Sequence, residues 1–151
     1  MQLTRFTDYC LRVLMYLSHK EELATIAELA QAYSVSENHL MKVVHHLARK
    51  KYIITLRGKG GGMRLARAAV DINLANVIED CEPTQGAVEC MREEYDGDCP
   101  LMSRCELRKA LYGAQRAFLD HLRQFSLQDL AANSGVQRVL LQDLPVAAIR
   151  H

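Results

Sequence analysis

The sequence from Ser36 to Leu65 reads SENHLMKVVHHLARKKYIITLRGKGGGMRL and contains the pattern that decides the fold. In its first half, apolar residues recur at the spacing of one helical face, after a serine of the kind that begins helices. The second half changes to the β-branched and aromatic run at 52–56, which predicts a strand. The glycine-rich segment RGKGGG then leads into a second short strand at 63–65. The stretch therefore predicts a helix followed by a hairpin with a basic, glycine-rich tip.

Two further helices are predicted upstream. Residues 3–19 carry apolar side chains at helical spacing over about four turns. Thr25 and Glu28 have the spacing of a capping box, which marks the start of a short helix ending near Tyr33. A turn of about three residues joins that helix to the next, as in a helix-turn-helix. With the hairpin appended as a wing, residues 1–67 are predicted to form a winged helix-turn-helix domain.

The helix after Ser36 carries polar and basic residues opposite its apolar stripe, including the neighbours His45 and His46. Side chains of this kind contact phosphates and base edges, and glycines at a wing tip allow close approach to a groove. An amphipathic helix with a solvated outer face is the alternative. We predict double-stranded DNA as the partner. The predicted contacts are Asn38, His39, Lys42 and His45 in the major groove, Arg49 on phosphate, and Arg57, Lys59 and Arg64 at the wing.

The glycine-rich tip could also belong to a nucleotide-binding loop. Such loops pass from a strand through glycines into a helix, usually with Lys-Ser or Lys-Thr at its start. Here the glycines lead into a strand-like segment and Lys59 precedes Gly60, so the wing is favoured. Residues 1–70 carry eleven Lys and Arg against five Asp and Glu, a net of +6, whereas the remainder has a net of −5. This asymmetry favours a polyanionic partner for the first half.

The bulk properties exclude several classes of protein. The 151 residues suffice for one ordinary domain, or for a small domain with an extension. No apolar run is long enough to span a membrane, and the charged N-terminus is not a secretory signal. Five cysteines, an odd number without a secretory route, favour free thiols in a reducing cytoplasm. No Ser/His/Asp or paired-carboxylate constellation supports an enzyme.

The second half is predicted to contain a linker helix at 71–81, capped by Asp71, within a linker and cysteine-loop region at 68–98. A long helix is then expected from about 100 to 125, beginning at Pro100 or just after it. Its apolar positions alternate in steps of four and three, as in a helix that pairs with its own copy in a dimer. Packing against its own domain is the alternative. Ser126 is expected to cap a short helix that completes a region at 99–132, followed by a tail at 133–151 that could be disordered. The predicted seam consists of Leu107, Leu111, Ala114, Phe118 and Phe125, with His121 or Leu122 between the last two.

Three of the five cysteines fall in one acidic, glycine-containing stretch, here termed the cysteine segment (Cys90–Cys105). Eight residues separate Cys90 from Cys99, and five separate Cys99 from Cys105. Thiolates gathered on a loop before a helix are a plausible site for a metal ion or an iron–sulfur cluster. Buried free thiols are the alternative. The spacing matches no common zinc motif, although a structural zinc site stays open.

Taken together, LTRFTDYCLRVLMYL, SVSENHLMKVVHHLARKKYI, RGKGGGMRL and the cysteine segment resemble the Rrf2 family of winged-helix regulators. Within it, FTDY and CPLMSRCELRKAL look most like the NsrR-type repressors, which sense nitric oxide. The resemblance covers the chain from Met1 to about Ala131. It implies a mainly α winged helix-turn-helix protein with a long dimerisation helix, acting as a homodimer on a palindromic operator. It also implies a [4Fe-4S] cluster, preferred over [2Fe-2S], whose ligands are Cys90, Cys99, Cys105 and, from the partner's first helix, Asp8.

The sequence departs from its apparent relatives in two ways. The [2Fe-2S] regulators of cluster assembly use a histidine three residues after their last cysteine, where this chain has Arg108. The gap between Cys90 and Cys99 is also longer than expected. Cys81 is an alternative fourth ligand, and Cys10 is expected to pack in the first helix. The competing functions are a sensor of iron, redox state or cluster supply, and an enzyme or electron carrier that uses the cluster.

Overall fold

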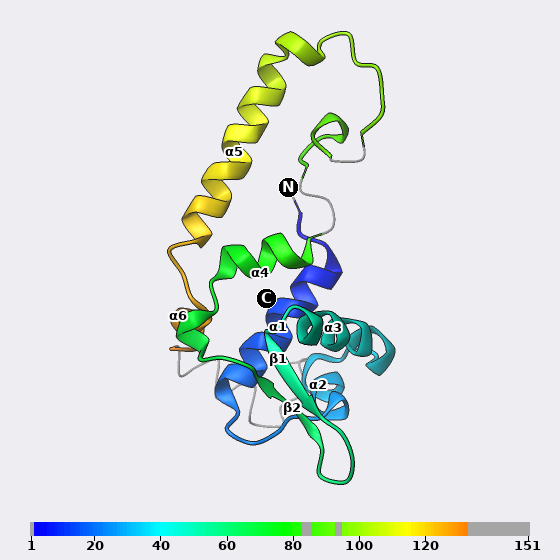
Figure 1. The fold of residues 1–151 in the computed structure, drawn as a ribbon, viewed down its shortest axis with the longest axis vertical. Helices are drawn as coiled ribbons and strands as arrows, with labels where there is room; N and C mark the ends of the chain where they lie inside the picture. The colour runs from blue at the N-terminus through cyan, green and yellow to red at the C-terminus, as the bar shows by residue number, and fades with distance from the viewer. Residues whose placement is uncertain (1, 83–85, 93–94, 133–151) are drawn as a thin grey trace.

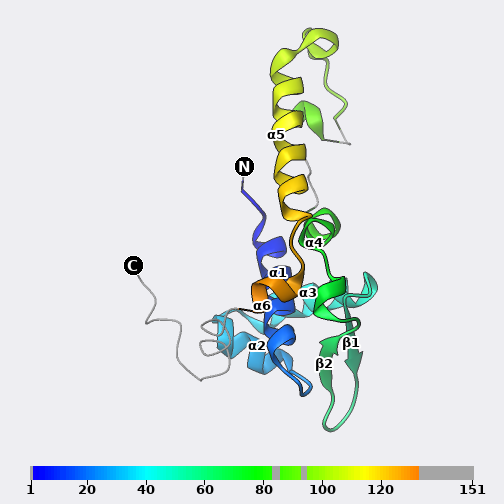
Figure 2. The ribbon, with the colours of Figure 1, turned by 90° about the vertical axis from the view of Figure 1, so that its left-hand side faces the viewer.

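The computed structural model describes residues 2–82, 86–92 and 95–132. Its elements are α1 (Arg5–His19), α2 (Ile26–Tyr33), α3 (Glu37–Arg49), β1 (Ile53–Leu56), β2 (Gly62–Leu65), α4 (Leu74–Cys81), α5 (Glu106–Leu122) and α6 (Leu127–Ala131). Short 3-10 turns lie at Ala69–Asp71, Glu89–Met91 and Met102–Arg104. Figures 1 and 2 show the first three helices and the hairpin gathered at one end, with α5 projecting from the other. The predicted mainly helical, winged architecture is confirmed.

The core of the winged helix-turn-helix domain forms where α1, α2 and α3 meet. Thr4 caps α1 by accepting a hydrogen bond from the backbone N–H of Thr7, and the apolar face of α1 then turns inward. Thr25 and Glu28 make the predicted capping box at the start of α2. Burial of about 25 cal/mol per Å² of apolar surface drives these helices together. The fully enclosed side chains include Val13, Leu14, Leu29, Leu40, Val43 and Leu47.

The wing is an antiparallel pair in which Ile53 lies opposite Leu65 and Leu56 opposite Gly62. Two hydrogen bonds between the backbones of Ala24 and Met63, of 2.9 and 2.8 Å, attach the base of the wing to the segment before α2. At the tip, Gly58 and Gly60 have φ angles of +99° and +78°, and nothing lies within 4 Å of where a side chain would begin. Glycine is the residue that adopts such angles without strain. The wing therefore has a fixed base and an open tip.

The short helix α6 returns the chain to the first domain. Ser126 and Asp129 form its capping box, which bears out Ser126 as the cap, and Leu127 is fully buried against the core. The backbone N–H of Leu127 donates to the carbonyl of Ile72, so α6 packs beside the linker as well as against α1. In contrast, α5 contains no buried residue among its 17 residues, all of which the structure describes. Leu107 and Tyr112 are 64% and 57% exposed.

Two predicted helix starts were wrong. The linker helix α4 is capped by Asn73, whose side chain accepts from the N–H of Ala75, whereas Asp71 belongs to the preceding 3-10 turn. The long helix α5 starts at Glu106 and not near Pro100, because Cys105 is its cap. The predicted tail at 133–151 lies outside the described residues. Within the described ranges, no helix has both the length and the apolar character needed to cross a bilayer.

Candidate nucleic-acid interface and cysteine segment

The outer face of α3 is open to solvent. Its buried stripe fixes how the helix is rotated against α1 and α2, so the opposite side chains point away from the core. All five predicted contacts on this helix are exposed, and so is the apolar Met41, at 49%. This face is therefore accessible to the major groove of a duplex. The five are Asn38, His39, Lys42, His45 and Arg49.

The start of α3 differs in detail from the sequence prediction. Ser36 is the N-cap residue, but its side chain makes no capping hydrogen bond to the backbone. Its hydroxyl instead lies 2.8 Å from Nδ1 of His39. This contact orients the His39 ring at the exposed N-terminal end of α3, where recognition helices contact base edges.

The assignment of His46 to the DNA face was wrong. Its ring is half-buried between α1 and α4, with an edge-on contact to Phe6 at 5.2 Å between ring centroids. Nε2 donates to the carbonyl of Asp80 at 2.9 Å, since a carbonyl oxygen only accepts. His46 therefore links the recognition helix to α4, and only His45 of the pair is exposed.

The wing supplies the remaining predicted contacts. Arg57 and Lys59 lie at the exposed tip, and Arg64 is exposed on β2 opposite Ile54. A fourth cation, Arg67, stacks over the Tyr52 ring at 4.7 Å from its centroid. Together with the outer face of α3, these residues form a basic surface from two adjacent elements, as phosphate contact requires.

Cys105 sets the start of α5. Its Sγ accepts a hydrogen bond from the backbone N–H of Arg108 at 3.4 Å, the position normally served by a Ser or Asp side chain. The Arg108 side chain also donates from Nε to the carbonyl oxygen of Cys90 at 3.3 Å. Two of the three cysteines are thus held against the first turn of α5.

Cys90 and Cys99 both lie close enough to Tyr95 to affect the pKa of its hydroxyl. The pKa of the Tyr95 hydroxyl is raised by partial desolvation and by the negative potential of these two cysteines and Glu89. All three cysteines of the segment are free and half-buried. Among the described residues, however, no three His, Cys, Asp or Glu side chains converge on a point where they could hold a metal ion. The three cysteines fit iron in donor chemistry, because they are accessible thiols beside a cation, although the described part of one chain does not bring them together around a single point.

Asp8 lies on the first turn of α1 and makes an i,i+4 ion pair with Arg12 at 3.0 Å. Its side chain is 45% exposed, so it is accessible to another chain. The guanidinium of Arg12 also lies over the ring of Tyr33, 5.8 Å from its centroid. Within one chain, the structure does not group Asp8 with the three cysteines.

The remaining thiols, Cys10 and Cys81, face each other in the core and are 0% and 3% exposed. A hydrogen bond between the two side chains, together with burial, raises the pKa of Cys10 far above the usual value for a thiol. Cys10 is core, as predicted. Cys81 is also a core residue, which places it away from the surface where the cysteine segment lies.

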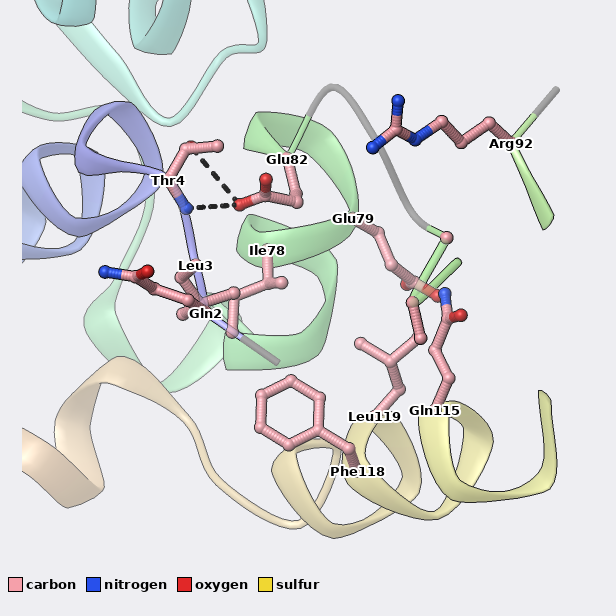
Figure 3. Close-up of a pocket in the computed structure, with 12 residues that line it drawn as sticks. Gln2, Leu3, Thr4, Ile78, Glu79, Glu82, Arg92, Gln115, Phe118 and Leu119 are labelled. Carbon is pink, nitrogen blue, oxygen red and sulfur yellow. Dashed lines mark hydrogen bonds between the residues drawn. The ribbon is translucent and has the colours of Figure 1, made fainter. Parts of the chain in front are cut away.

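A cavity of about 260 Å³ lies between the N-terminal end of α1, α4 and α5 (Figure 3). Its walls are apolar at Leu3, Ile78 and Phe118 and polar at Glu79, Glu82 and Arg92. The last of these comes from the cysteine segment, so the cavity lies where that segment, the linker helix and the first helix approach one another. A second hollow, of about 440 Å³, is lined by Cys105, Arg108 and Tyr112.

Comparison with known proteins identifies the family. The Rrf2 family model, described as an iron-dependent transcriptional regulator, matches residues 3–133. The chain belongs to the Rrf2 family. It is 43% identical over 143 residues to the HTH-type transcriptional regulator NsrR of Bacillus licheniformis, covering 93% of this chain and 99% of the relative. It is 40% identical over 135 residues to the regulator of the same name from Bacillus subtilis, covering 88% and 92%.

Solved structures agree on the fold of this Rrf2-family chain. CymR, the global cysteine regulator of B. subtilis, superposes with a TM-score of 0.69 at 22% identity, covering 87% of this chain and 97% of CymR. IscR of T. potens gives 0.65 at 16% identity, covering 87% of each chain. The chain is thus a DNA-binding transcriptional regulator with no enzymatic role, and the resemblance read from the sequence is confirmed.

Sequence reasoning missed the polar residues that join the linker to the DNA-binding domain. Thr4, Thr7, Tyr52, Asp80 and Glu82 make hydrogen bonds across 28 to 78 positions of the chain. Thr7, which is fully buried on the apolar side of α1, was the available signal, because a buried hydroxyl requires a partner. The identity of that partner, Glu82, depends on tertiary structure.

Proposed function

We propose that this Rrf2-family protein is a homodimeric repressor that carries an iron–sulfur cluster and releases a palindromic operator when nitric oxide reaches that cluster. The observation that carries the proposal is the position of the cysteine segment. Three free, half-buried thiols follow the linker helix of the DNA-binding domain and precede a long helix with no buried face. These thiols therefore lie between the DNA-binding domain and the proposed dimerisation helix α5, where a chemical change could affect both.

The residues proposed to hold the cluster are Cys90, Cys99 and Cys105, with Asp8 from the second copy of the chain. A [4Fe-4S] group is preferred over [2Fe-2S] because Arg108 occupies the position at which a histidine would be needed. When bound, the group supplies irons that take nitric oxide as a ligand. The contribution of the chain is to hold the thiols beside the cation Arg108 and to present Asp8 on the surface of α1.

The proposed dimer rests on α5. A helix of 17 residues without a fully buried side chain gains little stability from packing within its own chain. Leu107 is 64% exposed, and the seam that continues through Leu111 and Phe118 offers a matching surface to a second copy. Binding of both copies to one face of a duplex requires their recognition helices to lie about 34–36 Å apart, the distance between successive major grooves.

In the proposed complex, α3 reads the major groove through Asn38, His39, Lys42 and His45, and Arg49 meets phosphate. The wing residues Arg57, Lys59 and Arg64 follow the adjacent backbone. We place the protein in the cytoplasm, together with its DNA target and in surroundings that keep thiols reduced.

A second candidate function is sensing of iron, redox state or cluster supply by the same residues. The description of the family model as iron-dependent favours it. A structural zinc site is the third candidate.

One experiment separates these functions. Anaerobically purified protein is analysed for absorbance, iron, sulfide and zinc, beside Asp8→Ala and Cys99→Ala. Its affinity for a duplex, selected by the same protein from a random pool, is then measured before and after stoichiometric nitric oxide. The proposal expects a brown protein that loses affinity with nitric oxide. An iron-containing protein whose affinity for the duplex does not change with nitric oxide would favour the second function. A colourless protein with one zinc per chain would favour the third.

A further inference from the structure

Three consecutive residues at the end of α4, Asp80, Cys81 and Glu82, contact three different parts of the DNA-binding domain. This junction (Asp80–Glu82) is the last described stretch of the linker before residues 86–92 and the cysteine segment. Cys81 enters the core beside Cys10 of α1. The two acidic neighbours are directed toward polar partners on either side of it.

Asp80 holds the end of the recognition helix and the start of the wing. Its Oδ1 accepts from Nζ of Lys50 at 2.7 Å, and its Oδ2 accepts from the hydroxyl of Tyr52 at 2.7 Å. Its backbone carbonyl accepts from Nε2 of His46. Partial burial of Asp80 opposes ionisation, but the bonds from Lys50 and Tyr52 outweigh it and lower the pKa of the carboxyl. The carboxylate is therefore a charged, doubly bonded link between α4 and the DNA-reading elements.

Glu82 holds the first turn of α1. One carboxylate oxygen, Oε2, accepts from the backbone N–H of Thr4 at 3.0 Å, from the Thr4 hydroxyl at 3.2 Å and from the Thr7 hydroxyl at 2.7 Å. Figure 3 shows the Glu82 side chain directed at Thr4, beside the cavity between α1, α4 and α5. A carboxylate at a helix N-terminus is also favoured by the helix dipole. Asp8, whose N–H donates to the carbonyl of Thr4, lies on this same turn.

We propose that Asp80 and Glu82 are positioning residues that couple the cysteine segment to the recognition helix. Glu82 sets the position of the turn that carries Asp8, and Asp80 sets the position of the C-terminal end of α3 and the first residues of β1. A displacement of the chain that follows the junction would then move both the first turn of α1 and the C-terminal end of α3, because each carboxylate is fixed to its partners there by charge-assisted hydrogen bonds. This inference rests on the proposed function and adds to it the residues that carry the regulation.

The test measures coupling and not affinity alone. The affinity of the selected duplex is determined by anisotropy under anaerobic conditions for the cluster-loaded and the cluster-free protein, and the ratio is the coupling. The variants are Asp80→Asn and Glu82→Gln, with Tyr52→Phe and Thr7→Val as milder changes that remove a single hydroxyl donor. Asp71→Asn, an exposed acid just before the other end of α4, is the matched control. Thermal unfolding verifies that each variant is folded.

Regulatory coupling commonly changes affinity by about 5- to 150-fold. We expect the ratio of the wild type to lie in this range and to fall about fivefold or more in Asp80→Asn and Glu82→Gln, while Asp71→Asn keeps it. Tyr52→Phe and Thr7→Val should also lower this ratio. If the charge variants do not fold, these two variants test the roles of Asp80 and Glu82.

The possible failures can be told apart. A wild-type ratio near one overturns the proposed function and this inference with it. A large wild-type ratio that the variants preserve leaves the proposed function intact and overturns only the roles of Asp80 and Glu82. Hydrogen exchange gives a second readout: cluster removal should raise exchange at Thr7, Asp8 and residues 47–52 in the wild type but add little in the variants.

Discussion

The side chain of Arg108 donates from Nε to the carbonyl oxygen of Cys90, while the backbone N–H of the same residue donates to Sγ of Cys105. One residue on the first turn of α5 thus contacts the backbone of Cys90 and the thiol of Cys105. Because the guanidinium is always protonated, it also places a fixed positive charge beside them. Arg108 occupies the position at which some regulators of the family are expected to have a histidine ligand. Its contacts to Cys90 and Cys105 instead suit support of these proposed cluster ligands.

Replacing Arg108 should therefore weaken retention of the proposed cluster. We expect Arg108→Ala to speed loss of iron to a chelator by about tenfold, the usual effect of removing an outer partner of a metal ligand. Arg108→Lys should restore part of the effect through charge, and Lys109→Ala, which breaks only the exposed pair with Glu106, should have none. Equal rates in wild type and Arg108→Ala would contradict this role.

Arg49 and Lys59 should act through phosphate. Replacing either by alanine is expected to weaken binding of specific and nonspecific duplexes alike and to lower the slope of log affinity against log salt by about one. The measurement is a salt titration between about 50 and 200 mM, with Lys109→Ala as the control. A slope that stays unchanged in Arg49→Ala would move that residue from phosphate contact to base contact or to no contact.

Cys81 should be structural and not a ligand. Its side chain lies in the core against Cys10, so Cys81→Ala is expected to lower the free energy of unfolding by about 1–2 kcal/mol while leaving iron content unchanged. Denaturant unfolding and iron analysis on the same samples give both numbers. Loss of the cluster in Cys81→Ala, with the fold retained, would establish Cys81 as a ligand.

The ion pair between Lys20 and Glu28 should make stability depend on acid pH. The hydrogen bond from Lys20, aided by those from Thr25, lowers the pKa of Glu28 below its ordinary 4.5. The stabilisation is therefore complete above about 4.5 and is lost as pH falls through the lowered value. The same pair raises the pKa of Lys20, so on the alkaline side the stabilisation is lost only as pH rises through that raised value.

Glu28→Gln should accordingly flatten the decline in stability below about pH 4.5. Because the Glu28 side chain is 42% exposed, the difference at neutral pH should be less than about 1 kcal/mol. Urea midpoints of cluster-free protein at several pH values provide the test. Parallel declines for the two proteins would show that the pair contributes nothing.

The seam of α5 should control the oligomeric state. Leu107→Glu puts a charge on a side chain that is 64% exposed in one chain, so the isolated chain should tolerate it. In a dimer through α5 the same change should raise the dissociation constant by at least about tenfold, or about 1.4 kcal/mol. Sedimentation velocity over a dilution series measures it, and an unchanged dimer would place the interface elsewhere.

Local chemistry explains which parts of the fold were predictable from sequence. The capping box at Thr25, the cap at Ser126 and the wing strands depend on residues within a few positions of each other, and all three were predicted. The start of α5 was missed because its cap is the sulfur of Cys105, an unusual acceptor at that position. At the linker, Asp71 and Asn73 are both good caps. Asn73 is used because its amide also donates to the carbonyls of Arg123 and Phe125, about 50 residues away.

The candidate site was predictable only in part, for the same reason. Helical periodicity correctly placed Lys42 and His45 outside, since it depends on the stripe of α3 alone. It also placed His46 outside, and failed because α4 packs over that position and supplies the carbonyl of Asp80. Whether Asp8 approaches the cysteines depends on a second copy of the chain, which no spacing within one sequence reveals.

The wing is attached at one end only. Its base is bonded to the segment before α2 through Ala24 and Met63, and its tip turns through Gly58 and Gly60 with empty space around them. A hairpin with a bonded base and an unrestrained glycine tip can adapt to minor grooves of different width without displacing the recognition helix. Operators of this protein should therefore tolerate variation in the base pairs beneath the wing tip, provided that the positions facing α3 are kept.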